Sequence, residues 1–213
     1  MQLEELRRKL KEPPVKPECE NRRDAAVLIA LTADSYNLSH VESGLQKELS
    51  VLFEVRAKNL AVQPGEICLP GGGIEQGETP EQAAVRETSE ELLTEASRVD
   101  IIGKLPKMVT PRGGNLYPVI GVLSDYEGTY STDEVDHVFA VPLSFFLENE
   151  PACYEVGMET RPGEDFPYDL IPEGRSYPWA RRTRKIYFYQ YGDNVIWGVT
   201  AGVIRAFARR LLQ

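Results

Sequence analysis

The chain has 213 residues, of which 42% are hydrophobic, and a formal net charge of -9. This length and composition exclude a disordered chain and suit one domain with a sizeable core, so we expect a single domain over residues 1–213. The negative charge argues against a nucleic-acid-binding protein, which normally has a basic face. A small anionic ligand remains compatible with it, because bound cations can reverse the local field.

The cysteines and the apolar segments indicate the compartment. Cys19, Cys68 and Cys153 are too few and too scattered for a disulfide framework or a zinc site. The sequence has no signal-peptide-like apolar region and no apolar run long enough to span a bilayer. We therefore predict a cytoplasmic protein without a membrane partner.

The first predicted element is a short amphipathic helix over residues 2–11, which ends at Glu12-Pro13-Pro14. Residues 1–14 are interpreted as an N-terminal helical extension that caps the domain or contacts a second subunit. Two strands follow, over residues 24–32 and 49–56. The turn-rich segment between them indicates an antiparallel pair.

A glycine-rich loop and a helix are predicted next, over residues 69–94. Thr79 is a candidate N-cap and Pro80 fits the first helical position, so the helix should begin there. The apolar side chains expected to pack inward from this helix are Ala83, Ala84, Leu92 and Leu93.

The same helix carries a dense group of carboxylates. Glu87, Glu90 and Glu91 are spaced three and four residues apart, so their side chains should converge on one surface. Carboxylates crowded in this way repel one another unless a cation lies among them, and their hard oxygens suit Mg²⁺ or Mn²⁺. Arg86 is expected to hold one carboxylate through a two-pronged hydrogen bond.

The remaining elements complete the predicted fold. A closing helix is expected over residues 196–212, with an apolar stripe that faces the core. Further strands are predicted over residues 101–105, 117–124, 135–141 and 184–191. Strands on both sides of a central helix, with a terminal helix packed opposite, predict an α/β fold in the form of an α/β/α sandwich around a mixed sheet.

Residues 149–182 form a long segment rich in proline and tyrosine. Loops of this length are usually functional or disordered, and the aromatic content argues against disorder. We predict a strand pair and a lid over the pocket, with a contact in a homodimer as the competing role. Arg181, Arg182 and Arg184 could meet phosphate from this segment, or they could form a solvated basic patch.

Six residues of the loop and helix form a recognisable pattern. Their spacing, G-x5-E-x7-R-E-x2-E-E, resembles the signature of the Nudix hydrolases, which are metal-dependent enzymes that cleave nucleoside diphosphates linked to another moiety. The resemblance implies a Nudix-like sandwich and a diphosphatase activity. It also implies a metal site made of Glu87, Glu90, Glu91 and the Gly71 carbonyl. Leu93 stands where the family usually has glycine, which concerns the end of the helix. The six residues of the pattern are Gly72, Glu78, Arg86, Glu87, Glu90 and Glu91.

The stretch before this pattern resembles the additional motif of the coenzyme A diphosphatases, R-S/A-x2-L followed by G-x3-F-P-G-G. Leu69 replaces the usual Phe, and Ala61 and Gln63 stand where Arg and His are common. This resemblance implies hydrolysis of coenzyme A or acyl-coenzyme A to 3',5'-ADP and (acyl-)4'-phosphopantetheine. Arg56 is a candidate phosphate ligand, or else a strand-end arginine paired with a glutamate. The matching residues are Arg56, Ala57, Leu60, Gly65, Pro70, Gly71 and Gly72.

A general base must come within a hydrogen bond, or one water, of the nucleophile. Related enzymes often supply such a carboxylate from a later loop, where Glu134 is our candidate, with Asp133 and Asp136 as rivals and a solvent-facing acidic turn as the alternative. The candidate catalytic residues are Arg86, Glu87, Glu90, Glu91 and Glu134. The candidate substrate-binding residues are Arg56, Gly71, Gly72 and Gly73.

Two other functions remain open. The same chemistry could act on ADP-ribose, dinucleotides or nucleoside triphosphates. A catalytically silent nucleotide-sensing module on the same fold is the alternative from another class. Such a module should have lost carboxylates of the pattern, whereas this chain retains all of them.

Overall fold

A computed structural model of the protein describes residues 24–33, 48–111 and 113–213. The predicted helix over residues 2–11, the extension 1–14 around it and most of the segment between the first two strands lie outside this part. The described strands are β1 (Ala25–Thr32), β2 (Ser50–Arg56), β3 (Ile67–Cys68), β4 (Gly71–Gly73), β5 (Val99–Lys104), β6 (Met108–Val109), β7 (Asn115–Leu123), β8 (Val135–Pro142), β9 (Ala152–Met158), β10 (Arg182–Tyr191) and β11 (Asn194–Trp197). The described α-helices are α2 (Pro80–Glu91), α3 (Leu143–Glu148) and α4 (Gly198–Leu211).

Eight of these strands form one mixed sheet. Its main path runs β3-β2-β1-β7-β5, while β4 pairs with β1, β6 with β7 and β8 with β2. The central strand β1 is parallel to β7 and antiparallel to β2, where Leu31 faces Val51. The antiparallel pair predicted for the first two strands is therefore confirmed.

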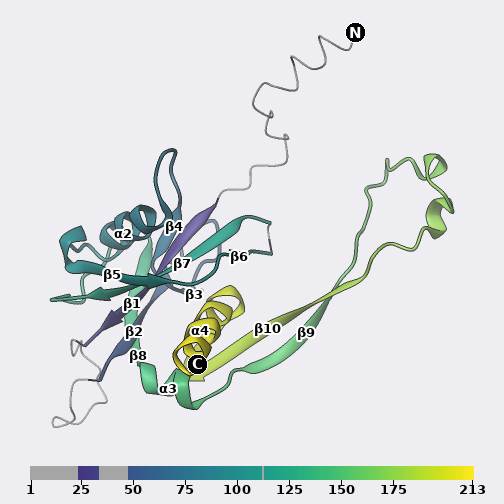
Figure 1. The fold of residues 1–213 in the computed structure, drawn as a ribbon. Coiled ribbons are helices and arrows are strands. Elements are labelled where there is room, and N and C mark those ends of the chain that lie inside the picture. Colours follow the sequence, from purple (N-terminus) through teal and green to yellow (C-terminus); the bar gives the residue numbers. More distant parts are fainter. Residues whose placement is uncertain (1–23, 34–47, 112) are drawn as a thin grey trace, which may run out of the picture.

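Helices cover both faces of this sheet (Figure 1). Successive residues of β1 point to opposite faces, as in any strand. Leu28 packs in one buried cluster with Ala83 and Ala84 of α2, whereas Ile29 packs in the other with Ile204 and Phe207 of α4. The predicted α/β/α sandwich is confirmed, and the side of α2 that carries Ala83 and Ala84 packs directly on the sheet.

Two details of the predicted helices are wrong. Residues 194–197 form strand β11, because the two-residue turn Gly192-Asp193 returns the chain against β10, and the helix begins only at Gly198, which has a φ of +67°. Leu93 was expected inside, but it is exposed and has a φ of +49°. The chain thus leaves α2 through a left-handed residue, at the position where a glycine would be unstrained.

The segment 149–182 contributes to a second sheet, β11-β10-β9. The predicted strand pair is found only in part: β9 lies inside the segment, but its partner β10 begins at the last residue of the segment, with register from Ala152 opposite Phe188 to Met158 opposite Arg182. We call residues 152–191 the arm. Figure 1 shows that the arm projects from the sandwich and that its tip lies away from α2, so in this arrangement it does not cover the acidic helix. Roles as a lid or as a homodimer contact stay predictions.

Candidate active site

The start of α2 is fixed by its own side chains. Thr79 Oγ1 accepts a hydrogen bond from the Gln82 backbone N–H at 3.2 Å, and Gln82 Oε1 accepts one from the Thr79 N–H at 2.9 Å. This reciprocal capping box, together with Pro80 in the first turn, confirms the predicted helix start. It determines which side chains of α2 face the glycine loop.

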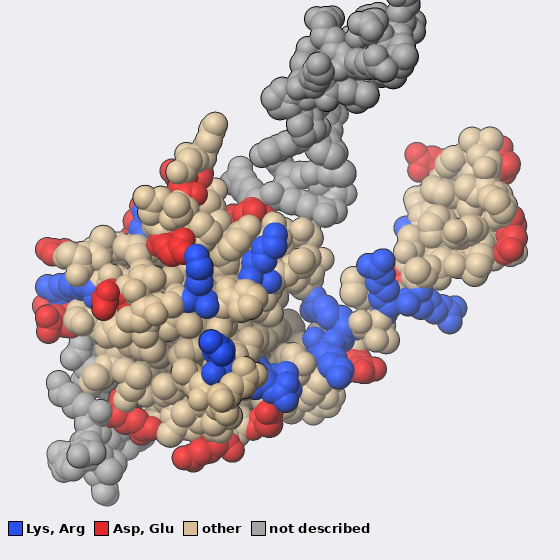
Figure 2. All heavy atoms as spheres, in the orientation of Figure 1, with Lys and Arg blue, Asp and Glu red and all other residues tan. Residues whose placement is uncertain are grey.

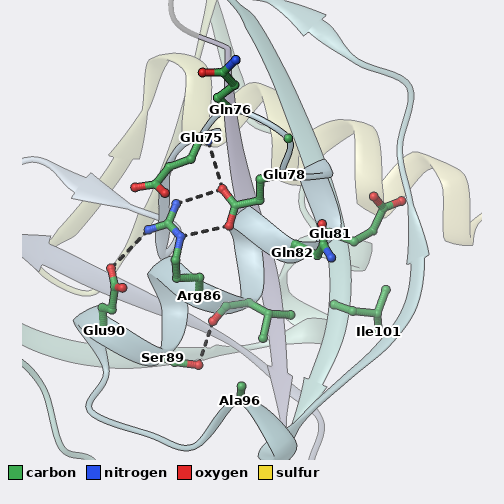
Figure 3. Close-up of a pocket in the computed structure, with 12 residues that line it drawn as sticks. Glu75, Gln76, Glu78, Glu81, Gln82, Arg86, Ser89, Glu90, Ala96 and Ile101 are labelled. Carbon is green, nitrogen blue, oxygen red and sulfur yellow. Dashed lines mark hydrogen bonds and ion pairs between the residues drawn. The ribbon is translucent and has the colours of Figure 1, made fainter.

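Arg86 ties the helix to that loop (Figure 3). Its Nε and Nη2 donate to the two oxygens of Glu78 at 2.9 and 3.1 Å, which is the predicted two-pronged bond. Its Nη1 donates to Glu87 at 2.9 Å and to Glu90 at 3.2 Å, and its Nη2 also reaches the Gly73 carbonyl at 3.0 Å. These bonds lower the pKa of Glu78, so its carboxylate stays charged and keeps the loop in place.

Two loop glycines are required for different reasons. A Cβ at Gly72 would lie 2.5 Å from the Glu87 carboxyl group, so only glycine lets that side chain rest on the loop. A Cβ at Gly71, whose φ is +142°, would lie 2.3 Å from the Ala26 backbone carbonyl oxygen on β1. At Gly73 an added Cβ would meet open space.

Glu91 is a buried carboxylate at the last residue of α2. Its side chain is 3% exposed, and its Oε2 accepts a hydrogen bond from the Gly71 N–H at 2.8 Å. Burial raises its pKa well above the usual range, and the nearby charge of Glu54 raises it further. Ionisation of the Glu91 carboxyl group is therefore unfavourable unless a cation lies nearby.

Glu54 is a second buried carboxyl group, which the sequence analysis did not single out. It lies within β2 and is 1% exposed; its Oε1 accepts a hydrogen bond from Cys68 Sγ at 3.1 Å. Burial raises its pKa strongly. The sequence signal for it was a charged residue inside the apolar strand Leu52-Phe53-Glu54-Val55. In the structure Glu54 lies on the same side of this strand as Leu52, which packs against α2.

The three helix glutamates do not form a ready-made ion site. Within residues 24–33, 48–111 and 113–213, no group of three or more Cys, His, Asp or Glu side chains is gathered closely enough to hold a metal. Arg86 holds Glu87 and Glu90 instead, and the Glu90 side chain is 61% exposed. Arg86 Nη1 contacts both Glu87 and Glu90, so these two carboxylates lie on one surface as expected. A metal site that they form together with Glu91 stays a prediction.

Glu134 is the late acidic residue whose charge reaches the buried carboxylates. It is exposed, and its backbone is fixed by a hydrogen bond from the Ala57 N–H to its carbonyl at 2.8 Å. Its charge raises the pKa of Glu54, Glu87 and Glu91. Its rival Asp136 pairs with His137 at 2.8 Å, which lowers the pKa of Asp136.

Two hollows lie near these residues. The one on the outer side of α2, of about 850 Å³, is lined by Glu75, Glu78, Glu81 and Glu90, with Arg86 as a cation among them (Figure 3). Four carboxylates there would repel an anionic ligand.

The second hollow, of about 630 Å³, is the one that contains Arg56. Its walls are mainly apolar, and Arg56 Nε donates to the Val62 carbonyl at 3.4 Å. Within the described ranges Arg56 forms no ion pair, so the alternative of a strand-end pair with a glutamate is not seen. The apolar lining side chains include Val27, Ile67, Val199 and Val203.

The three arginines of residues 181–184 are not brought together at the site. Arg181 and Arg182 are exposed on the arm, and Arg181 lies 3.8 Å from Glu159. Arg184 lines a small cavity that shares Thr110 and Val199 with the Arg56 hollow. Figure 2 shows Lys and Arg along the arm and Asp and Glu at its tip.

An acidic helix that follows a glycine loop on an α/β/α sandwich is the arrangement that the sequence resemblance implied. The family model described as NUDIX domain matches residues 45–160, more than half of the chain. The chain therefore belongs to the Nudix family, and it is a Nudix hydrolase. Enzymes of this family act on nucleoside diphosphate derivatives and generally use divalent cations such as Mg²⁺ or Mn²⁺.

Known relatives agree with this assignment. The "Uncharacterized Nudix hydrolase NudL" of Citrobacter koseri is 30% identical over 201 residues, covering 93% of this chain and 88% of that protein. The protein of the same name from Escherichia coli K12 is 28% identical over the same lengths. A MutT/nudix family protein from Enterococcus faecalis is 15% identical with a TM-score of 0.52, covering 100% of this chain and 71% of that one, which supports the fold. No helix in the described part of the chain is long and apolar enough to cross a membrane.

Proposed function

We propose that the chain hydrolyses the diphosphate bond of coenzyme A or acyl-coenzyme A, with Mg²⁺ or Mn²⁺, to 3',5'-ADP and (acyl-)4'-phosphopantetheine. The observation that carries this proposal is the hollow around Arg56. It combines Arg56, which forms no ion pair among the described residues, with a mainly apolar wall in which Glu66 is the one carboxylate, and its volume is within the range of ligand pockets. Coenzyme A presents the matching chemistry: phosphate groups joined to a long, partly apolar arm.

Position also favours this hollow for the substrate. Cys68 is among its lining residues and donates a hydrogen bond to Glu54, so one residue connects the hollow with that buried carboxyl group. Arg184 lies in the neighbouring cavity and is a second cation for the 3'-phosphate. The larger hollow beside α2 is acidic and would oppose a polyanion.

The donor set fits a hard divalent cation. Glu87 and Glu91 supply carboxylate oxygens, with Glu90 and the Gly71 carbonyl as further donors, and one buried oxygen of Glu54 has no hydrogen-bond partner among the described residues. Such a cation, when bound, would neutralise charge on the diphosphate and make water a better nucleophile. Arg86 positions Glu87 and Glu90, and Glu134 is the candidate general base that takes the proton of the attacking water.

A hydrolysis panel tests the proposal. Purified protein is incubated with coenzyme A, acetyl-coenzyme A, ADP-ribose, a dinucleotide and nucleoside triphosphates, with Mg²⁺, with Mn²⁺ or with EDTA, and the products are identified by mass spectrometry. We expect 3',5'-ADP and 4'-phosphopantetheine from coenzyme A, at the highest kcat/KM of the panel and only with a divalent cation. A higher kcat/KM for ADP-ribose, dinucleotides or triphosphates would reject coenzyme A as the substrate.

The role of Arg56 is tested in the same assay. Arg56→Gln should raise the KM for coenzyme A about tenfold, since a charged hydrogen bond to phosphate contributes about 1.5–3 kcal/mol. Arg175→Gln is the matched control, because Arg175 lies at the arm tip over the Tyr168 ring. An unchanged KM in Arg56→Gln would remove Arg56 from the substrate site.

A further inference from the structure

Glu54 occupies a position where a charged side chain is costly. It lies between two neighbouring strands, opposite Cys68 on β3 and Val138 on β8. Leu52, two residues earlier on the same face, packs in the cluster that contains Ala83 and Ala84 of α2. The Glu54 carboxyl group is thus buried in the layer between the sheet and α2, in which water cannot solvate it.

The hydrogen bonds of Glu54 satisfy only half of its carboxyl group. Oε1 accepts from the Cys68 thiol, whose own pKa is raised by burial, so the thiol remains a neutral donor. Oε2 is buried without a hydrogen-bond partner among the described residues. An unpaired buried carboxylate oxygen is strongly unfavourable, so either a proton or a cation must compensate it.

The surroundings of Glu54 favour a cation. Glu87 and Glu91 from α2 and Glu134 from the loop before β8 are the acidic groups that interact with it electrostatically. Arg56 is the basic group that acts on Glu54, and Arg86 is hydrogen-bonded to Glu87. The charges of these four carboxylates therefore act on one another, and a cation bound near Glu54 would reduce their repulsion.

We propose that Glu54 is a ligand of the divalent cation, reaching it from β2 through Oε2 while Glu87 and Glu91 reach it from α2. The inference rests on the proposed metal-dependent function and adds a sheet residue to a site otherwise made of loop and helix groups. Cys68 is a positioning residue, because its thiol fixes the Glu54 carboxyl group and leaves Oε2 free.

Metal binding in the absence of substrate tests this ligand. Mn²⁺ is titrated into the EDTA-treated, dialysed protein by calorimetry, and free Mn²⁺ is counted by electron paramagnetic resonance. Glu54→Gln keeps the shape of a protonated glutamate but removes the charge, and we expect it to weaken Mn²⁺ binding at least about tenfold, since even outer residues of metal sites contribute 10–100-fold. The matched control is Glu155→Gln, which changes an exposed strand glutamate on the arm. It should bind like the wild type.

Two further measurements separate metal binding from folding. Without metal, Glu54→Gln should melt at a higher temperature than the wild type, because a buried carboxyl group with an unpaired oxygen has been neutralised; with Mn²⁺ its melting temperature should rise less. Cys68→Ala keeps the carboxylate, so its loss of affinity should be smaller than that of Glu54→Gln. If glutamine at this position prevents folding, Glu54→Thr supplies a neutral, strand-compatible replacement for the same titration.

The outcomes distinguish the two proposals. Wild-type affinity for Mn²⁺ in Glu54→Gln would identify Glu54 as a protonated structural acid and overturn this inference, while the proposed function would stand. Absence of Mn²⁺ binding by the wild type itself would overturn both. Weakened binding in Glu54→Gln with an unchanged Glu155→Gln would support both.

Discussion

The layer between α2 and the sheet differs from the arm in the kind of side chain that each exposes to water. Under α2, Glu54 and Glu91 are 1% and 3% exposed, whereas on the arm Tyr154 is 61% and Leu170 77% exposed. Charged side chains are rarely buried without partners, and large apolar side chains are usually covered. One region therefore keeps acids away from water, and the other presents apolar groups to it.

The buried carboxylates and the exposed apolar side chains affect the stability of the protein differently. Buried carboxylates reduce the stability of the protein until a cation or a proton neutralises them. Exposed apolar side chains on the arm reduce the stability little, because they take no part in core contacts. We therefore expect substitutions under α2 to change activity and metal response, and substitutions of exposed arm residues to leave the sandwich intact.

The largest expected effect is that of Glu91→Gln. Loss of this carboxylate should lower kcat by about a thousandfold or more with saturating Mg²⁺, because the diphosphate charge is then poorly neutralised. The fold should persist, since glutamine can still accept the hydrogen bond from the Gly71 N–H. Steady-state kinetics and circular dichroism provide the measurements, with the exposed Glu95→Gln as control. Full activity in Glu91→Gln would refute the metal site.

The next largest effects are expected from alanine substitutions in the glycine loop, at Gly71, Gly72 and Gly73. Gly71→Ala should lose about 1–3 kcal/mol of stability or more, because its Cβ meets the β1 backbone at a positive φ. Gly72→Ala should fold but lose about 10–100-fold in kcat/KM, because its Cβ displaces the movable carboxylate of Glu87. Gly73→Ala, with open space, should change neither.

Urea unfolding and kinetics of the same three proteins give the measurements. If Gly72→Ala were as active as Gly73→Ala, the position of Glu87 against the loop would be irrelevant to catalysis. If Gly71→Ala were as stable as Gly73→Ala, the close approach of β4 to β1 would not constrain this position.

Local sequence patterns predict much of the region around α2. Thr79 and Pro80 determine the start of α2 through contacts within a few residues, so the helix was predictable. The parallel pairing of β1 with β7, more than eighty residues away, depends on the packing of the whole sheet and left no local signal.

The site itself was predictable in its residue types and less so in its geometry. The spacing of Glu87, Glu90 and Glu91 does not reveal that Arg86 forms hydrogen bonds to two of them. Burial of Glu54 depends on which face of β2 meets α2, and a short apolar strand does not reveal that face. Contacts between segments that are distant in the sequence therefore determine the side-chain geometry that residue spacing alone does not specify.

A smaller effect is expected in the pH dependence of stability without metal. The folded-state pKa values of Glu54 and Glu91 lie above the ordinary value of 4.5, so the folded protein retains protons that the unfolded chain releases. Stability should be greatest below that value and decrease as the pH rises above it, by at most about 1.4 kcal/mol per pH unit for each group.

Urea unfolding in EDTA between pH 5 and 8 measures this decrease. The wild type should lose more stability over that interval than Glu54→Gln, because the variant lacks one of the two groups, and saturating Mn²⁺ should reduce the difference. Identical pH profiles for the two proteins would show that Glu54 does not change its protonation on unfolding.

The smallest expected effect lies on the arm and is best measured against a matched core residue. Val51 on β2 is buried and Val156 on β9 is exposed. Val→Thr preserves the branched shape but adds a hydroxyl group, so Val51→Thr should cost about 1–3 kcal/mol, whereas Val156→Thr should change the free energy of unfolding by less than about 0.5 kcal/mol. Urea unfolding at two protein concentrations measures both. A large, concentration-dependent loss in Val156→Thr would show that a second copy of the chain covers the arm, and the contrast between the two regions would then hold only for the monomer.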